Sequence, residues 1–192
     1  DISKTSSSLF FSLAFLNQTP GVIKEAIKKI KKDNTVFCYG LADKKVGDLE
    51  LTKPDGKVSV IHPSALKKNL PKAFQEEVVG GKGIRMHHKF LVLDFNKASA
   101  RVYTGSYNFS KAADNKNGEN LWLIKDRRIA TSFAVASLAM FDHYHFRVLQ
   151  AKAKEARKEI TLSKPPQKSN EKTWWEEDYT NERKILDRKL FA

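Results

Sequence analysis

A run of four apolar residues at positions 90–93, Phe-Leu-Val-Leu, constrains the fold more than any other stretch of the chain. Polar residues bound it on both sides, His87-His88-Lys89 before it and Asp94 after it. A short, continuous apolar run of this kind is typical of a strand buried on both faces. Because side chains alternate along a strand, we expect His87 and Lys89 on one side and His88 on the other. An imidazole and an ammonium on the same side can bind one anion together.

Two further polar groups stand at the ends of predicted strands. Gly105-Ser106-Tyr107-Asn108 follows the predicted strand 101–104, and Glu119-Asn120 precedes the apolar stretch 121–124. Glycine lets the backbone approach a ligand closely, and serine and asparagine offer neutral hydrogen-bond donors. These groups therefore suit the oxygens of a phosphate.

In this order and spacing, the residues resemble the HKD motif, which is the signature of the phospholipase D superfamily. Members of that superfamily cleave or exchange phosphodiesters without a metal. Glu119 and Asn120 are similar to the acidic residue and the asparagine that often follow the motif. The motif positions are His87, Lys89, Asp94, Gly105, Ser106 and Asn108. A lone His-x-Lys is usually a solvated strand edge, whereas the ordered set favours a phosphate site. Asp94 and Gly105 are further apart than in the shortest members, which predicts a longer hairpin turn through residues 96–99.

Phosphodiester cleavage needs a nucleophile, a proton donor for the leaving oxygen, and positive charge or hydrogen-bond donors around the phosphoryl oxygens. His87 can attack phosphorus if a carboxylate holds its other nitrogen, and Glu119 is the candidate for that role. Lys89 supplies charge. We therefore predict His87, Lys89, Asp94 and Glu119 as catalytic residues. The predicted phosphate-binding residues are Lys89, Ser106, Asn108 and Asn120.

Asp94 has two interpretations, which the sequence leaves open. It can take part in catalysis directly, or it can cap the strand by accepting hydrogen bonds from the turn. His88, expected on the other side of the strand, is assigned to packing or to support of the site.

The resemblance also implies that two motifs meet across a pseudo-twofold axis, one histidine acting as nucleophile and the other as general acid. This chain carries one motif and no internal repeat. It is therefore expected to form a homodimer or to be one half of a longer tandem protein, so that a second phospholipase D-like half completes the active site.

The charge of the chain favours polyanionic partners. Its 192 residues include 35 Lys and Arg against 22 Asp and Glu, for a net charge of +13. Nucleic acid is the first candidate partner and an anionic phospholipid surface the second, although a basic surface can also be merely solvated.

No cofactor and no metal site are predicted. The single cysteine, Cys38, excludes an intrachain disulfide, and it lies in an apolar stretch typical of a buried strand. His143 and His145 fall on a predicted helix, where side chains two residues apart diverge, and no third ligand is evident.

The pattern along the chain predicts an α/β fold with a mixed, mostly parallel β-sheet flanked by helices on both faces, as the resemblance also implies. We expect strands at 8–16, 35–41 and 57–62, with helices at 22–32 and about 128–158. The second helix should bury one apolar face, made of Ile129, Phe133, Ala136, Met140, Tyr144 and Val148. The loop 80–85, with Lys82 and Arg85, is expected at the rim of the site. His62 follows a strand end and is interpreted as a loop histidine, with a place near the site as the alternative. Trp122 is assigned to the core.

We expect a catalytic domain over residues 1–160, a linker over 161–172 rich in proline and polar residues, and a tail over 173–192. Trp174 and Trp175 should dock this tail on the domain or on a partner subunit. A sharper hypothesis places the tail over the mouth of the site. The chain starts at Asp1, so targeting information can be lost and the compartment stays open.

These observations predict a phosphodiesterase, and so a hydrolase, that works without metal through a phosphohistidine intermediate. The leading hypothesis is a nuclease that cleaves DNA or RNA. The alternative is a phospholipase D or phosphatidyl transferase, although no clear acyl-chain cleft or surface amphipathic helix is evident. A non-catalytic module that binds nucleic acid or dimerises is a third possibility.

Overall fold

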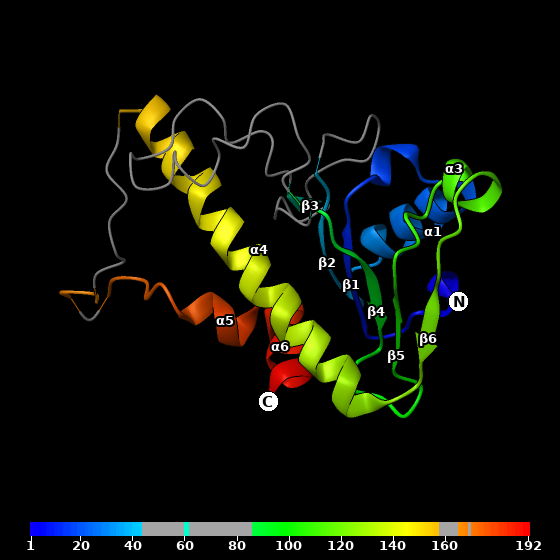
Figure 1. Cartoon of the computed structure of the whole chain (residues 1–192). Helices are drawn as coiled ribbons and strands as arrows, with labels where there is room; N and C mark the ends of the chain where they lie inside the picture. Colours follow the sequence, from blue (N-terminus) through cyan, green and yellow to red (C-terminus); the bar gives the residue numbers. More distant parts are fainter. Residues whose placement is uncertain (44–59, 62–85, 158–164, 169) are drawn as a thin grey trace.

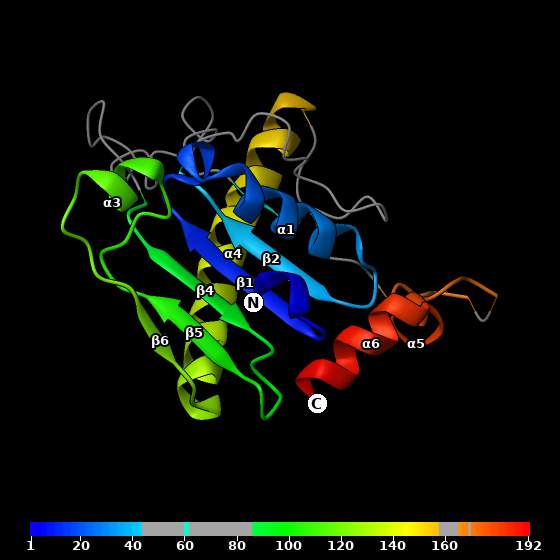
Figure 2. The same ribbon diagram turned by 90° about the vertical axis from the view of Figure 1, so that its right-hand side faces the viewer.

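The computed structural model describes residues 1–43, 60–61, 86–157, 165–168 and 170–192. A six-stranded sheet in the order β3-β2-β1-β4-β5-β6 forms the centre, with α1 on one face and α4 on the other (Figures 1 and 2). The predicted α/β class, a mixed sheet with helices on both faces, is confirmed.

The strands of the sheet are short and are centred on β1 and β4. Their bounds are β1 Ser8–Leu13, β2 Phe37–Leu41, β3 Val60–Ile61, β4 Lys89–Leu93, β5 Arg101–Thr104 and β6 Trp122–Ile124. β1, β2 and β3 pair in parallel, whereas the pairs β1–β4, β4–β5 and β5–β6 are antiparallel. The expectation of a mostly parallel sheet is therefore wrong for the half that carries the motif. A short turn after β4 leads into β5, and a connection of that length permits only antiparallel pairing.

The first crossover confirms the predicted β-α-β start. β1 ends at Leu13, earlier than expected, and a 3-10 turn η2 (Leu16–Gln18) leads to α1 (Gly21–Lys32). A 3-10 turn η1 (Ile2–Lys4) precedes β1. Ile27 and Ile30 of α1 are buried in the same cluster as Leu9 and Phe11 of β1. Alternation along β1 sends Phe10 to the other face, where it joins the core under α4.

The long helix α4 (Arg127–Glu155) covers the second face. Its buried positions include Ala130, Ala134, Ser137 and Phe141. Of the predicted apolar face, Phe133 and Met140 pack against the core, whereas Ile129 is 40% exposed and Ala136 is also exposed. Alanines let the helix approach the sheet closely, and the large rings of the sheet then fill the core. The helix adds Phe133, whose ring lies 5.3 Å from that of Phe90. In the part of the chain that is described, no helix combines the length and the apolar character that a membrane span requires.

The C-terminal segment ends in two helices, α5 (Glu176–Thr180) and α6 (Glu182–Phe191). The Phe191 ring lies 5.0 Å from that of Phe37 and 5.8 Å from that of Phe95, between ring centroids. An Arg183 guanidinium nitrogen donates hydrogen bonds to the carbonyl oxygens of Asn34 and, at 3.1 Å, of Val36. α6 therefore packs on the end of the sheet where β2 begins and β4 finishes.

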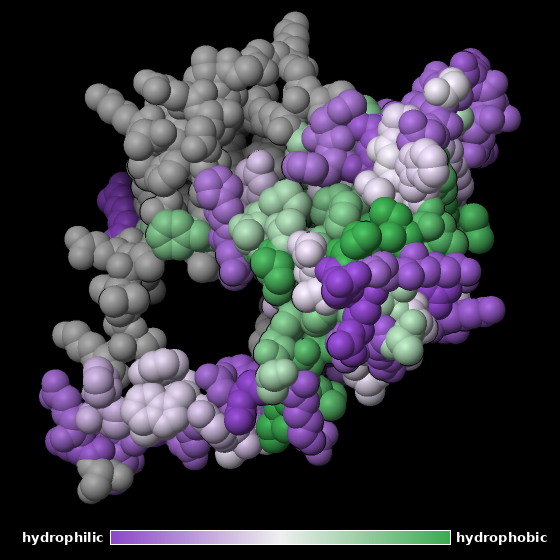
Figure 3. Space-filling model, turned by 60° about the horizontal axis from the view of Figure 1, so that its bottom comes forward, coloured by the Kyte–Doolittle hydropathy of each residue, from purple (hydrophilic) through white to green (hydrophobic). Residues whose placement is uncertain are grey.

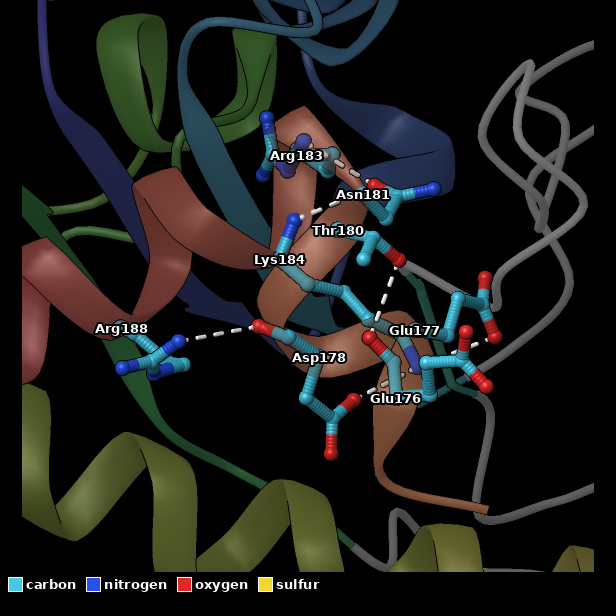
Figure 4. A network of polar contacts seen from close by, with 8 residues as sticks. All are labelled: Glu176, Glu177, Asp178, Thr180, Asn181, Arg183, Lys184 and Arg188. Atoms are coloured by element: carbon cyan, nitrogen blue, oxygen red, sulfur yellow. Dashed lines mark hydrogen bonds and ion pairs between the residues drawn. The ribbon is translucent and has the colours of Figure 1, made fainter. Parts of the chain in front are cut away.

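Polar contacts hold α5 against α6 (Figure 4). Lys184 Nζ lies 2.7 Å from a carboxylate oxygen of Asp178 and 3.2 Å from one of Glu177. Asn181 caps α6 by accepting a hydrogen bond from the Arg183 backbone N–H at 3.0 Å.

Viewed from the bottom of the molecule, apolar side chains gather in a band between hydrophilic ones (Figure 3).

Candidate active site

The predicted nucleophile and its lysine lie at the start of β4. Lys89 opens the strand, and His87 and His88 come directly before it. The antiparallel register pairs Leu13 with Lys89, and the Ala14 backbone N–H continues the ladder by donating to the His88 carbonyl oxygen at 3.1 Å. This pairing brings the residue after Ala14, Phe15, alongside His87.

Two contacts with Met86 fix the approach to His87. The Met86 backbone N–H donates to a carboxylate oxygen of buried Asp43 at 3.1 Å, and its sulfur accepts from Ser12 Oγ at 2.8 Å. The backbone is therefore anchored one residue before the imidazole, which is itself exposed.

Lys89 is buried, with 8% of its surface exposed. Its Nζ donates to the His87 carbonyl oxygen at 2.8 Å and lies 5.9 Å from the centre of the Phe15 ring. Burial lowers the pKa of Lys89, and the negative charge of Glu119 partly opposes that shift. A partly desolvated ammonium interacts more strongly with a phosphate than a solvated one does.

His88 points to the other side of β4, as predicted, where its ring lies 6.2 Å from that of Phe90. Burial lowers the pKa of His88, and the charges of Lys89 and His87 lower it further. The side chain lies on the α4 side of the sheet beside Phe90 and is itself exposed.

Gly105 lets the loop after β5 close against residue 120. Its φ is +146°, and a Cβ there would lie 2.5 Å from both the carbonyl oxygen and Oδ1 of Asn120. The Ser106 N–H donates to Asn120 Oδ1 at 3.1 Å, and the Asn120 N–H donates to Ser106 Oγ at 2.9 Å. This reciprocal pair of hydrogen bonds holds Ser106 and Asn120 together. Both residues lie at the end of the sheet where β4 begins, because Phe90 pairs with Thr104 and Thr104 with Trp122.

Glu119 holds Asn108 from two sides. The Asn108 backbone N–H donates to one carboxylate oxygen at 2.7 Å, and its Nδ2 donates to the other at 2.8 Å. Asn117 Nδ2 adds a third hydrogen bond at 2.9 Å. Burial alone raises the pKa of Glu119, but these hydrogen bonds and the charge of Lys89 lower it overall. Among the described residues no hydrogen bond joins Glu119 to His87, so the structure places Glu119 as the support of Asn108.

The loop that carries Asn108 is anchored by the next helix, α3 (Lys111–Asn115). The Tyr107 hydroxyl donates a hydrogen bond to the Asp114 carboxylate. Burial, together with that carboxylate, raises the pKa of Tyr107 to about 12. Asn108 Oδ1 is buried and, within the described residues, has no hydrogen-bond partner.

Asp94 lies at the opposite end of β4 from Lys89. Five strand residues place the two ends roughly 16 Å apart. The Asp94 carboxylate accepts hydrogen bonds from the backbone N–H groups of Ser6 at 3.0 Å, Ser7 at 2.8 Å and Ser8 at 3.3 Å, and from Ser7 Oγ at 3.0 Å. Of the two interpretations, this geometry favours the structural one, because the structure does not bring Asp94 to His87. The predicted hairpin turn follows it, closed by the Lys97 N–H on the Asp94 carbonyl oxygen at 2.8 Å.

Other predictions about the surroundings of the site need correction. Trp122 is 65% exposed and not part of the core, because β6 is the edge strand and α4 diverges from it. The C-terminal tail does not cover the end of the sheet that carries His87, because α6 packs at the opposite end, where β4 finishes at Asp94. Trp174 and Trp175 are 57% and 38% exposed, with their rings 5.2 Å apart. His62, Lys82 and Arg85 lie outside the described residues.

Sequence reasoning missed three supporting residues. Phe15 contacts His87 and Lys89, Asp43 anchors Met86, and Asn117 supports Glu119. Only Asn117 stands close to a motif residue in sequence. The described residues contain no group of three or more His, Cys, Asp or Glu side chains that could hold a metal ion.

Residues 1–138 match the family described as cardiolipin synthase, PLD-like domain. A phospholipase D of Rickettsia prowazekii is 29% identical over 120 residues, which cover 58% of this chain and 57% of the relative, so the chain matches little more than half of that protein. A phospholipase D of Rickettsia felis is 45% identical over 47 residues, or 24% of this chain and 22% of the relative.

Among solved structures, the chain is similar to Nuc from Salmonella typhimurium, described as a phospholipase D family member. The sequence identity is 23% and the TM-score 0.43, over 78% of this chain and 82% of that one.

Proposed function

Because this chain belongs to the phospholipase D-like family, we propose that it is a metal-independent phosphodiesterase that forms a phosphohistidine intermediate on His87, with nucleic acid as its substrate. One observation carries the proposal. The exposed His87 imidazole and the buried Lys89 ammonium stand at the same end of the sheet as the tethered donors Ser106, Asn108 and Asn120.

In the first step, a nitrogen of His87 attacks phosphorus and the bond from phosphorus to the leaving oxygen breaks. Lys89 and the neutral donors stabilise the charge on the phosphoryl oxygens. A second imidazole gives its proton to the leaving oxygen. In the second step this imidazole takes a proton from water, the water oxygen bonds to phosphorus, and the bond to His87 breaks.

The second imidazole comes from another motif. This chain carries one motif, and we propose that a second copy of the chain, or a second half of a longer protein, supplies the general acid. Glu119 contributes indirectly, because its two hydrogen bonds with Asn108 fix the direction in which that amide faces the substrate.

The net charge of +13 supports nucleic acid as the substrate. The many phosphates of a nucleic acid can each interact with basic side chains, whereas a single lipid headgroup can interact with only a few. The relatives named phospholipase D support a second candidate, a phospholipid diester. Both substrates offer the same phosphodiester to His87.

The test compares substrates side by side in excess EDTA. Single-stranded DNA, double-stranded DNA, RNA and a labelled phospholipid are incubated with the native protein and with His87→Ala. We expect nucleic-acid cleavage that His87→Ala abolishes and that His88→Ala retains. Cleavage of lipid alone would assign the protein to the second candidate. Absence of turnover on every substrate, at concentrations that favour self-association, would contradict the proposal.

A further inference from the structure

Phe15 contacts both reactive groups of the candidate site. Its ring centroid lies 6.0 Å from that of His87, with the two planes at 89°, and 5.9 Å from Lys89 Nζ. Edge-to-face packing at this separation is a preferred aromatic geometry, and an ammonium within about 6 Å of a ring centroid is attracted to the ring.

The backbone holds Phe15 firmly in this place. The Gln18 N–H donates to the Phe15 carbonyl oxygen at 2.7 Å, within the turn η2. On the other side, the Ala14 N–H extends the β1–β4 ladder to His88 at 3.1 Å. Phe15 is half-buried, whereas His87 is exposed. The backbone of Phe15 is therefore fixed, and its half-buried ring lies beside an exposed imidazole that would otherwise sample several rotamers.

The contact also gains strength during the proposed reaction. Attack on phosphorus turns the neutral imidazole into a positively charged phosphoimidazolium. The electron-rich ring attracts a cation more than a neutral group, so the Phe15 contact favours the product of the first step over the free enzyme. The same ring keeps the Lys89 ammonium beside His87 before substrate arrives.

We propose that Phe15 is a positioning residue of the site, which orients the His87 imidazole and the Lys89 ammonium for attack on phosphorus. The inference rests on the proposed function for its catalytic consequence. Its structural part, a fixed His87 rotamer, stands independently of any turnover.

The experiment compares Phe15→Leu, Phe15→Met and Phe15→Tyr with the control Phe95→Leu. Phe95 is a buried ring at the far end of β4, so its loss tests general destabilisation. For the two aliphatic variants at position 15 we expect kcat to fall about tenfold with KM nearly unchanged, because an orienting contact acts after binding. Phe15→Tyr keeps the ring and should stay within about threefold of the native kcat. The control should lower the melting temperature and leave kcat unchanged well below it.

A second readout needs no catalysis. In the native protein the assigned His87 ring protons should carry a ring-current shift, which Phe15→Leu removes and Phe15→Tyr retains. Native kcat in both aliphatic variants, or His87 shifts that do not respond to them, would overturn the inference. Should the native protein cleave no phosphodiester, the proposed function fails while the His87 shifts still decide whether Phe15 orients the imidazole.

Discussion

The two ends of β4 show how one motif serves two different purposes. At the start of the strand, His87 is exposed, and the buried Lys89 ammonium contacts a carbonyl oxygen and an aromatic ring. At the far end, backbone and hydroxyl donors from residues 6–8 surround the Asp94 carboxylate, and its φ is +53°. Groups at the first end are available to a ligand, while the carboxylate at the second end is satisfied by the protein itself.

Closeness in sequence therefore does not bring all the motif residues into one site. Asp94 fixes where β4 ends and ties that end to the residues before β1. Strand β4 then carries His87 and Lys89 at a defined position along β1. We infer that the aspartate supports the site through the register of the sheet.

Lys89→Met should have the largest effect at the catalytic end. It removes the positive charge and keeps an unbranched apolar chain, so we expect kcat to fall about 10²- to 10³-fold. Stability should not decrease, because a buried ammonium pays a desolvation cost that methionine avoids. The matched control Lys97→Met changes a lysine at the other end, where Nζ contacts Ser6 Oγ at 2.8 Å, and should leave kcat within about twofold. Steady-state kinetics and chemical denaturation check both variants. Equal kcat values for the two would contradict a specific catalytic role for the lysine at the His87 end of β4.

Asp94→Ala should act on stability. Several backbone donors lose their acceptor, so we expect the free energy of unfolding to fall by about 2–4 kcal/mol while the folded protein keeps kcat within about threefold. Asp94→Asn is the matched variant, because asparagine tolerates the positive φ and retains one oxygen acceptor, and it should lose less. A large loss of kcat at unchanged stability would instead make Asp94 catalytic.

The pH dependence sharpens the same prediction. Burial by itself raises the pKa of Asp94, but hydrogen bonds from Ser6, Ser7 and Ser8 hold it below its usual value overall. A carboxyl with a depressed folded-state pKa stabilises the protein fully above its unfolded pKa of about 3.9 and loses that contribution as pH falls through the folded value. The stability difference between the native protein and Asp94→Ala should therefore stay constant from about pH 7 to 5 and shrink below about pH 4. Urea titrations across this range measure it, and a difference that grows on acidification would contradict the assignment.

Phe191→Ala should have the smallest effect. Its ring is 45% exposed and contacts Phe37 and Phe95, so we expect a loss of about 1–2 kcal/mol of stability and no change in kcat. Val135→Ala, on the exposed side of α4, is the control and should cost about 0.5 kcal/mol or less. Thermal melts and kinetics measure both variants. A lower kcat for folded Phe191→Ala would contradict the view that only the His87 end of β4 takes part in catalysis.

Local patterns were sufficient to predict the elements around the site. The apolar run of β4 is buried throughout, and Gly105 stands where a close approach excludes any side chain. The amphipathic pattern of α1 also gave its bounds to within one residue.

The predictions that failed concern the burial of side chains, and burial depends on tertiary contacts. α4 buries Ala130 and Ala134 rather than Ile129, because close helix–sheet packing favours small side chains over the largest apolar ones. Trp122 is exposed because its strand is at the edge of the sheet, a position that no local pattern reveals. The pairing of Phe15 with His87 depends on the register between strands far apart in sequence.

Trapping the covalent intermediate would test the proposed role of His87 most directly. A phosphodiester substrate with a labelled phosphoryl group is mixed with the native protein, quenched in alkali within one turnover, and digested for mass spectrometry. We expect an acid-labile phosphoryl adduct on His87, absent from His87→Ala and retained in Asp94→Asn. An adduct on another residue, or continued turnover in His87→Ala, would contradict a phosphohistidine intermediate on His87.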